Sequence, residues 1–481
     1  MKGDFREMPD GPDQVSAHVA SWDRRGFLLA SLSGLAACSG IGPDYVPPTI
    51  TLTDSFAENA AAQTGDVAVS RWWTELGDQK LNDLVARGLA QNLSVTAALQ
   101  AVDEARANAR AAGLGNQISG GVRASVTGVD VSEDALGIIP DQVRSATLSA
   151  GTALAGMDRR QEAALAGLEA AELDVGTARL AYLSSLVGAY IDARYFQETL
   201  ELTRQSIVDN TRILRIVERE RSLGQAAELD VARAKAQLAS VSAEQPSLES
   251  AFLANVYGIA ALLSEPAEPL IKTLQAGAPQ PIPRSAPQVG TPANLLRNRP
   301  DIRATERRYA SAVAAIGVAE AQLYPTLTLS GTISASDSLD ASLFGPSLAL
   351  PVFNRGALTA RRDAAKATAQ KAETAWRASV LGAVRDVQTA QSAYRLSRRR
   401  VSQLQEAVSA TRTAFTLTER AFEDGAIPLL DLLSAELTLT EARVGLAQAV
   451  QQSASEWLAL QIATGSGWAS VSRSSASAQA E

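Results

Sequence analysis

The pattern of apolar and polar positions predicts two very long helices. No proline lies between Pro140 and Pro246 or between Pro351 and Pro428, and proline is the residue that most often ends a helix. Within each segment the repeat positions step by three and four, which is the spacing of a coiled coil. These positions are Leu200, Thr203, Ile207, Asn210, Leu214, Val217 and Arg221, and again Val401, Leu404, Val408, Thr411, Phe415, Thr418 and Phe422. We expect the first helix over about 158–223, roughly 100 Å long.

The two series are related by an internal duplication. Every position of the first series corresponds to the position 201 residues later in the second, as 200 does to 401. The segment after each helix matches as well, GQAAELDVARAKAQL at 224–238 with GAIPLLDLLSAELTL at 425–439. Each half therefore predicts a long helix, a glycine-led turn and a returning helix. Gly224 and Gly425 suit a left-handed helix end, and Asp230 suits the first turn of a return helix. These residues could be helix caps alone, or they could have a second role at the turns, which form the tips of the two helical hairpins.

Short strands are predicted between the helices. The segment 324–336 alternates strictly between apolar and hydroxyl residues, and a partner strand is expected over 347–353. The first half has weaker counterparts around 122–127 and 145–154. Strands of about ten residues have the length of tilted membrane strands. We expect one β-hairpin in each half of the chain.

Four such strands cannot close a barrel, since the smallest outer-membrane barrels have eight. An open sheet edge in lipid leaves unpaired backbone groups, each costing several kcal/mol. Three copies of the chain would supply twelve strands. The alternative is a soluble pair of hairpins on a helical body.

The amino terminus has the features of a lipoprotein signal. The apolar stretch 26–37 follows two arginines and is shorter than the ~20 residues that span a bilayer. The motif Leu35-Ala36-Ala37-Cys38 resembles a bacterial lipobox, in which the Cys38 thiol is acylated and becomes the first mature residue. Ser39 rather than Asp follows, which matches sorting to the outer membrane. An ordinary signal peptide with a chance cysteine is the alternative, and both the general and the twin-arginine export routes stay open.

The composition excludes several function classes. The chain has 44 Lys and Arg against 52 Asp and Glu, a net charge of -8, so no basic face for nucleic acid is expected. Cys38 is the only cysteine and His18 the only histidine. Processing at Cys38 removes His18 and leaves no free thiol, which excludes histidine- or cysteine-based catalysis and metal sites. Serine–lysine or paired-carboxylate chemistry stays formally open, but no motif marks it. We expect no catalytic residue, no metal and no cofactor.

Three motifs resemble those of a known family. They are LLRNRPDIRATERRYASAVAAIGVAEAQLYPTLTLSG at 295–331, GPDYVPP at 42–48 and RWW at 71–73. They are similar to those of the TolC-like outer-membrane efflux factors, in the NodT-type lipoprotein branch. The resemblance covers nearly the whole mature chain. One departure is TALAGMDRRQEA at 152–163. The family usually has a different sequence at this place, between its first β-hairpin and the helix that follows.

The resemblance implies a fold, partners and a function. The fold would be mainly α with a small β part, with duplicated long antiparallel helical hairpins and two β-hairpins per chain. A homotrimer would form an α-barrel tunnel in the periplasm and a 12-stranded β-barrel in outer-membrane lipid. The trimer would dock at its helical tips to a periplasmic adaptor protein and an inner-membrane efflux transporter of the resistance-nodulation-division class. It would be a passive exit duct for drugs or other small toxic solutes.

The resemblance also implies sites at the tips. A periplasmic gate is expected at Leu430 and Ser434, where related proteins carry a carboxylate in place of Ser434; nearby Asp431 is a further candidate. Gly224, Asp230 and Gly425 are candidate positions for adaptor docking. Leu430 could equally be a core residue of a 430, 433, 437 coiled-coil series.

The expected organisation follows from these segments. We expect a signal peptide at 1–37, a lipid-anchored segment at 38–75 and a first repeat at 76–270 with a hairpin at about 118–155. A proline-rich linker at 271–292 leads to a second repeat at 293–467, with a hairpin at about 325–353, and a polar tail at 468–481. An exit duct for type I protein secretion and a structural coiled-coil envelope lipoprotein are the alternative functions.

Overall fold

A computed structural model describes residues 41–58, 67–114, 119–128, 142–153, 157–285, 289–336 and 340–469. The signal segment, Cys38 and most of the expected tail lie outside these ranges. The described part is mainly helical, with four strands between the helices in two hairpins. Trp468 and Ala469, which we expected in the tail, belong to the folded body: the Trp468 indole donates to the Asn298 carbonyl, and the Ala469 amide to that of Ala68.

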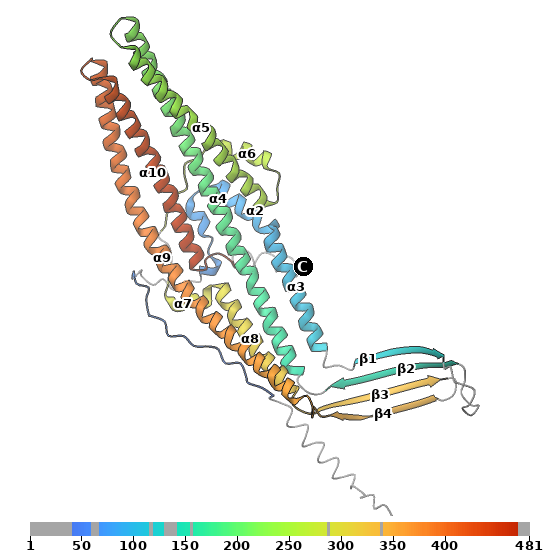
Figure 1. Cartoon of the computed structure of the whole chain (residues 1–481). Helices are drawn as coiled ribbons and strands as arrows, with labels where there is room; N and C mark the ends of the chain where they lie inside the picture. Colours follow the sequence, from blue (N-terminus) through green and yellow to red (C-terminus); the bar gives the residue numbers. More distant parts are fainter. Residues whose placement is uncertain are drawn as a thin grey trace, which may run out of the picture.

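Two long helical hairpins form the body (Figure 1). Helix α4 (Met157–Ser222) and helix α9 (Arg355–Glu423) have 66 and 69 residues. Helix α5 (Glu228–Leu263) returns along α4, and helix α10 (Leu429–Ala463) returns along α9. The two expected long helices and their return helices are confirmed. Pro246 lies inside α5, so proline does not end a helix there.

The return helices are about half as long as α4 and α9, which we call the rods. Other helices cover the remaining half of each rod. Helix α3 (Leu93–Leu114) lies along α4, while helix α8 (Pro300–Ala321) packs against both α4 and α9. Each rod thus has a helical partner over almost its full length. This arrangement repeats in both halves of the chain, as the duplication predicts.

The main core lies where the shorter helices meet the middle of the rods. It involves η3 (Trp72–Leu76), α2 (Gln79–Gln91), α6 (Ala267–Gln275) and α7 (Pro292–Asn298), besides α4, α5, α9 and α10. Trp72 packs edge-on against both Trp73 and Trp457, with ring centroids 5.6 Å apart in each pair. This aromatic cluster joins the amino-terminal segment to the end of the last helix.

A second apolar cluster joins the two hairpins near their tips. Its buried members come from all four helices: Ile213, Val217, Val231, Ala234, Phe415, Phe422, Leu429, Leu432, Leu433 and Leu439. The predicted repeat positions Val217, Phe415 and Phe422 are among them. Arg221, the last position of the first series, is exposed. Because the cluster spans both hairpins, the tips of one chain are a single packed unit.

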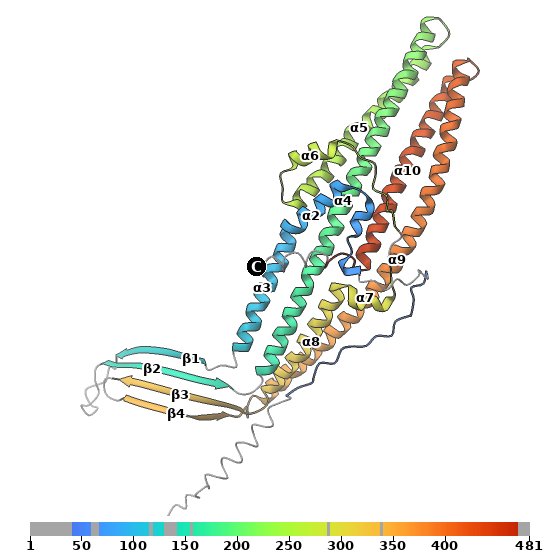
Figure 2. The ribbon, with the colours of Figure 1, turned by 180° about the vertical axis from the view of Figure 1, so that it is seen from behind.

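The strands form one antiparallel sheet at the end opposite the tips (Figure 2). They are β1 (Ser119–Gly128), β2 (Gln142–Ala153), β3 (Thr326–Ser336) and β4 (Asp340–Ala349), in that spatial order. Pairing of β2 with β3 joins the hairpins of the two halves.

Strand β4 begins and ends earlier than the 347–353 that we expected. Thr326, the first residue of β3, pairs with Ala349, so the ladder ends there. Gly345 and Pro346 interrupt the apolar alternation that we used to place the strand.

Candidate functional site

The two tips have the same glycine-dependent turn. Gly224 has φ +75° and Gly425 has φ +70°, both in the left-handed region. The Gly224 amide donates to the Arg221 carbonyl and the Gly425 amide to the Phe422 carbonyl, each over 2.9 Å. A Cβ at either position would meet nothing within 4 Å. The backbone angle, and not packing, therefore requires glycine at these two tips.

The aspartates that follow the two turns are not equivalent. The Ala227 amide donates to the Asp230 carboxylate over 3.3 Å, so Asp230 caps α5. The position matching Ala227 in the second half is Pro428, which has no N–H to donate. Asp431 therefore lacks the capping bond of its duplicate and stands exposed on α10. Of the two aspartates at this matching position, only Asp230 makes the capping bond.

Leu430 lies on the exposed face of α10, not in the core. Its side chain is 52% exposed, whereas its neighbours Leu429 and Leu432 are buried. Leu437 is also exposed, so a core series of 430, 433 and 437 is wrong for two of its three members. The Ser434 hydroxyl donates to the Leu430 carbonyl over 2.8 Å. Leu430, Ser434 and Leu437 are one turn apart and form an uncovered stripe on the single chain.

A buried polar cluster that our sequence analysis missed joins the two hairpins. The Ser206 hydroxyl of α4 donates to the Glu436 carboxylate of α10 over 2.5 Å, and the Thr440 hydroxyl donates to the same oxygen over 3.0 Å. The Asn210 amide donates to the Ser206 carbonyl over 2.9 Å. One signal was available, since Asn210 and Thr203 occupy core positions of a coiled-coil series. Polar residues at such positions usually pair across helices and specify register.

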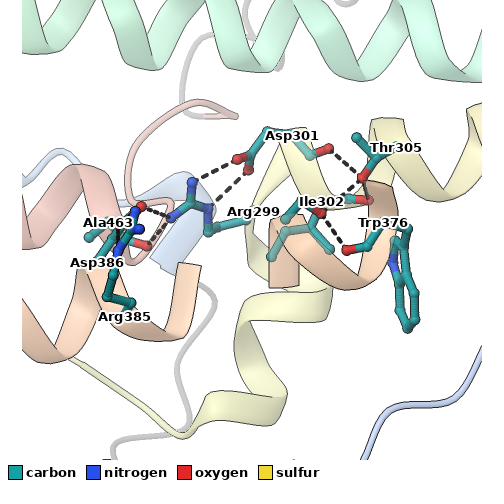
Figure 3. Close-up of polar contacts among 9 residues, drawn as sticks. Arg299, Asp301, Ile302, Thr305, Trp376, Arg385, Asp386 and Ala463 are labelled. Atoms are coloured by element: carbon teal, nitrogen blue, oxygen red, sulfur yellow. Dashed lines mark hydrogen bonds and ion pairs between the residues drawn. The ribbon is translucent and has the colours of Figure 1, made fainter. Parts of the chain in front are cut away.

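Arg299, which lies in the motif at 295–331, connects four helices (Figure 3). Its guanidinium binds both carboxylate oxygens of Asp301, at 3.0 and 2.6 Å. It also donates to the carbonyl of Ala463, the last residue of α10, over 3.2 Å, and lies 3.8 Å from the Asp386 carboxylate of α9. Because Arg299 links α7 to α8, this one side chain fixes the ends of α7 and α10 relative to α8 and α9.

A second arginine, which is fully buried, holds the first half together in the same way. Arg194 of α4 is 1% exposed and donates to the Leu274 carbonyl near the end of α6 over 3.2 Å. It also donates to the Tyr190 hydroxyl, which donates in turn to the Asp78 carboxylate that caps α2. Burial and the bond to Asp78 raise the pKa of Tyr190. The phenol therefore stays neutral and able to donate.

The register of the sheet separates apolar from polar positions. One row across three strands holds Val122, Leu148 and Ile333, and the next row holds Arg123, Thr147 and Ser334. Residues directly opposite one another in an antiparallel sheet share a face. Across β1, β2 and β3, apolar residues therefore align with apolar ones and polar with polar, which is the alternation of strands between lipid and water.

The polar groups described so far join helices to one another. In the described residues, no group of three or more histidine, cysteine, aspartate or glutamate side chains could hold a metal ion. The polar clusters found there are shared between helix ends and helix faces, where they hold elements together. The distinctive features are long rods, matched tips and a sheet with aligned apolar and polar rows.

Known proteins share this sequence and fold. A family model described as "Outer membrane efflux protein" matches residues 84–265 and 291–466, one segment in each half. The nodulation protein T of Rhizobium leguminosarum bv. trifolii is 35% identical over 463 residues, which is 93% of this chain and 97% of that protein. The pyoverdine export outer membrane protein OpmQ of Pseudomonas putida is 30% identical and covers 92% of this chain and 97% of its own.

The solved structure of the outer-membrane channel OprN has the same fold. It superposes with a TM-score of 0.79 at 30% identity, over 89% of this chain and 99% of its own. Fold, duplication and sequence agree over nearly the whole length. The protein is an outer-membrane efflux channel, and the chain belongs to the outer membrane efflux protein family.

Proposed function

We propose that three copies of this chain assemble into a passive duct that crosses the outer membrane and extends into the periplasm. In this trimer the strands close a 12-stranded barrel and the helices form one tunnel. The observation that carries the proposal is the open sheet. In the described residues β1 and β4 each pair on one side only, which leaves two unpaired edges. Lipid does not tolerate such edges, and joining β1 of one copy to β4 of the next removes them.

Uncovered apolar surface supports the same assembly. Phe344, Leu348 and Leu350 alternate along β4 and its exit, and each is at least half exposed. Helix α5 is long and apolar enough to cross a membrane by length and composition, yet only 28% of its most apolar 18-residue window is buried. Helix α5 packs against α4, so a neighbouring copy of the chain is the partner that would cover its exposed apolar surface. Lipid would cover the apolar face of the sheet.

The partners and cargo follow from the family. The tips at Gly224 and Gly425 would dock a periplasmic adaptor, which would join the duct to an inner-membrane efflux transporter. The energy source would lie in that transporter. OpmQ is named for export of a small molecule, pyoverdine, so we favour small solutes as cargo. A duct for type I protein secretion is the alternative.

The closed end of the duct would lie at the tips. Leu430 would form an apolar ring that resists wetting. Two features favour Asp431 over Ser434 as the polar member of this gate. The Ser434 hydroxyl is bonded to its own helix, and Asp431 is released from the capping role of its duplicate by Pro428.

Reconstitution tests the proposal directly. Purified full-length protein in a planar bilayer should give discrete conductance steps. Light scattering, with the detergent contribution subtracted, should give the mass of a trimer. A well-folded monomer that is stable without detergent, or a trimer that never conducts, would contradict the proposal.

A further inference from the structure

The buried polar cluster between α4 and α10 holds one carboxylate and no basic side chain. We call Ser206, Asn210, Glu436 and Thr440 the oxygen cluster. It joins α4 to α10, which lie side by side in both views (Figures 1 and 2). Ser206, Asn210 and Glu436 are each at most 3% exposed. In the part of the chain that the structure describes, the Glu436 carboxylate forms no ion pair.

The side-chain donors of the oxygen cluster are all used inside it. The hydroxyls of Ser206 and Thr440 both donate to the same Glu436 oxygen, Oε1, over 2.5 and 3.0 Å. The Asn210 amide nitrogen donates to the Ser206 carbonyl over 2.9 Å and to the Ser206 hydroxyl oxygen over 3.3 Å. A carbonyl can only accept, so the amide nitrogen must face it and the amide oxygen must face away. The cluster therefore has no side-chain hydrogen left to donate.

The oxygen cluster keeps a surplus of acceptors. Glu436 Oε2 and Asn210 Oδ1 are buried and, among the described residues, have no hydrogen-bond partner. The Thr440 hydroxyl gives its hydrogen to Glu436 and keeps its lone pairs. Burying oxygens without a partner is costly, and burying a carboxylate without a counter-charge is more costly still. The cluster thus needs a donor or a cation from outside it.

The surroundings of the oxygen cluster are apolar and do not neutralise it. Leu433 and Leu439, on either side of the carboxylate along α10, belong to the buried apolar cluster near the tips. Arg204 and Arg212, which flank the cluster on α4, are exposed and form ion pairs with other glutamates. The one basic residue of α10, Arg443, is about two helical turns further along. A mobile cation is therefore the partner that fits.

From this inventory we propose that the oxygen cluster binds a sodium ion, with Glu436 Oε2, Asn210 Oδ1 and the Thr440 hydroxyl oxygen as ligands. Hard cations take oxygen ligands, and a single positive charge balances the single carboxylate. Calcium favours several carboxylates and would leave a net positive charge in a buried, apolar setting. Our expectation of no metal rested on histidine and cysteine, which an alkali ion does not need.

The proposed ligands come from both helical hairpins. Asn210 belongs to α4, whereas Glu436 and Thr440 belong to α10. Bound sodium would hold α10 against α4 just behind the tips, and separation of the two helices would break the site. Sodium would thus favour closed tips. This consequence rests on the proposed duct, but sodium binding itself does not.

Hydrogen exchange tests sodium binding in purified full-length protein in detergent. In about 100 mM sodium chloride, against choline chloride at the same ionic strength, amides of residues 433–443 should exchange about tenfold more slowly. This is the factor expected when sodium is present at about ten times its Kd. Equal exchange in the two salts would overturn the proposal, because a buried proton or water satisfying the cluster would not respond to sodium.

Two matched variants separate the site from the acidic surface. Glu436→Gln keeps the size of the side chain and removes its charge, so the sodium effect should be lost. Glu441→Gln removes the same charge from an exposed residue of the same helix and should keep the full effect. Circular dichroism checks that both variants fold. A sodium effect of equal size in both variants would overturn the proposal.

Asn210→Asp tests the proposed ligand set. The variant places a second carboxylate at the unpartnered oxygen, so calcium should now slow exchange in residues 433–443, as it does not in the unaltered protein. Absence of a calcium response in the variant would show that Asn210 is not a ligand and would overturn the site. All these measurements are made without conductance, so failure of the duct and failure of the sodium site are distinguishable.

Discussion

Ser206 of α4 donates a hydrogen bond to the buried carboxylate of Glu436 on α10, 230 residues away in the sequence, over 2.5 Å. The two side chains are 2% and 3% exposed. In the described residues the second carboxylate oxygen of Glu436 and the side-chain oxygen of Asn210 have no partner. This contact joins the two hairpins just behind the tips, so its strength bears on how easily α10 separates from α4.

The first prediction concerns this contact. Ser206→Ala leaves the carboxylate with one donor fewer and should lower the free energy of unfolding by about 1–3 kcal/mol. Adding Glu436→Leu should recover much of the loss, because an apolar pair does not need the bond. Urea unfolding followed by circular dichroism gives both values. Ser242→Ala, in which the lost bond is to its own helix, is the control and should cost less.

The second prediction concerns the exposed stripe at the tip. Leu430→Ser should raise the resting conductance of reconstituted trimers, because a polar ring is easier to wet. The duplication supplies a matched control, Leu229, which is 56% exposed in the first half. Leu229→Ser should leave the conductance unchanged, with helicity retained in both variants. Equal effects of the two changes would place the constriction elsewhere.

The third prediction concerns the joint at Arg299. Lysine keeps the charge but cannot bind Asp301 through two nitrogens while also reaching the Ala463 carbonyl. Arg299→Lys should weaken the joint by about 2 kcal/mol, a roughly thirtyfold faster amide exchange at the end of α10. Arg385→Lys is the matched control, because Arg385 is exposed and binds only the adjacent Asp386 among the described contacts. An unchanged amide exchange rate in Arg299→Lys would show that the two-nitrogen contact of Arg299 with Asp301 is not needed to hold the end of α10.

The fourth prediction is a pH dependence at Glu58, in the extended amino-terminal segment 41–58. Hydrogen bonds from Arg395 and then Ser392 hold the pKa of Glu58 below its usual value. A carboxylate whose pKa is lowered on folding stabilises the folded state above its unfolded pKa, about 4.3. This contribution is lost as the pH falls through the folded pKa. The protection of amides in residues 50–58, measured relative to their intrinsic exchange rates, should therefore fall below about pH 4. Glu58→Gln should abolish that dependence.

The fifth prediction concerns the anchor. Each buried CH₂ of an acyl chain contributes about 0.8 kcal/mol to membrane binding, so several chains hold firmly. Cys38→Ala should fail to incorporate labelled palmitate in cells, whereas Ser39→Ala should still do so. Label that persists in Cys38→Ala would place the modification at another residue. Insertion of the trimer can survive the change if the barrel itself holds the membrane.

The sequence alone determined the parts of the fold that depend on local periodicity. The rods α4 and α9 followed from proline-free segments with coiled-coil spacing, and the matched tips at Gly224 and Gly425 followed from the duplication. Glycine marked both turns because a left-handed backbone angle is a local requirement that one residue satisfies. The strand pattern at 324–336 was equally readable, because alternation of side chains is a property of a single strand.

Tertiary structure decided which of these periodic positions meet. Leu430 fits a coiled-coil series in the sequence, but Leu432 packs into the apolar cluster near the tips, which leaves Leu430 exposed. Strand β4 was misplaced because its bounds depend on its register with β3 and not on its own alternation. The Ser206–Glu436 and Arg159–Asp44 contacts join residues 230 and 115 positions apart. Such pairs depend on how whole helices pack, and no local pattern records the partner of a buried charge.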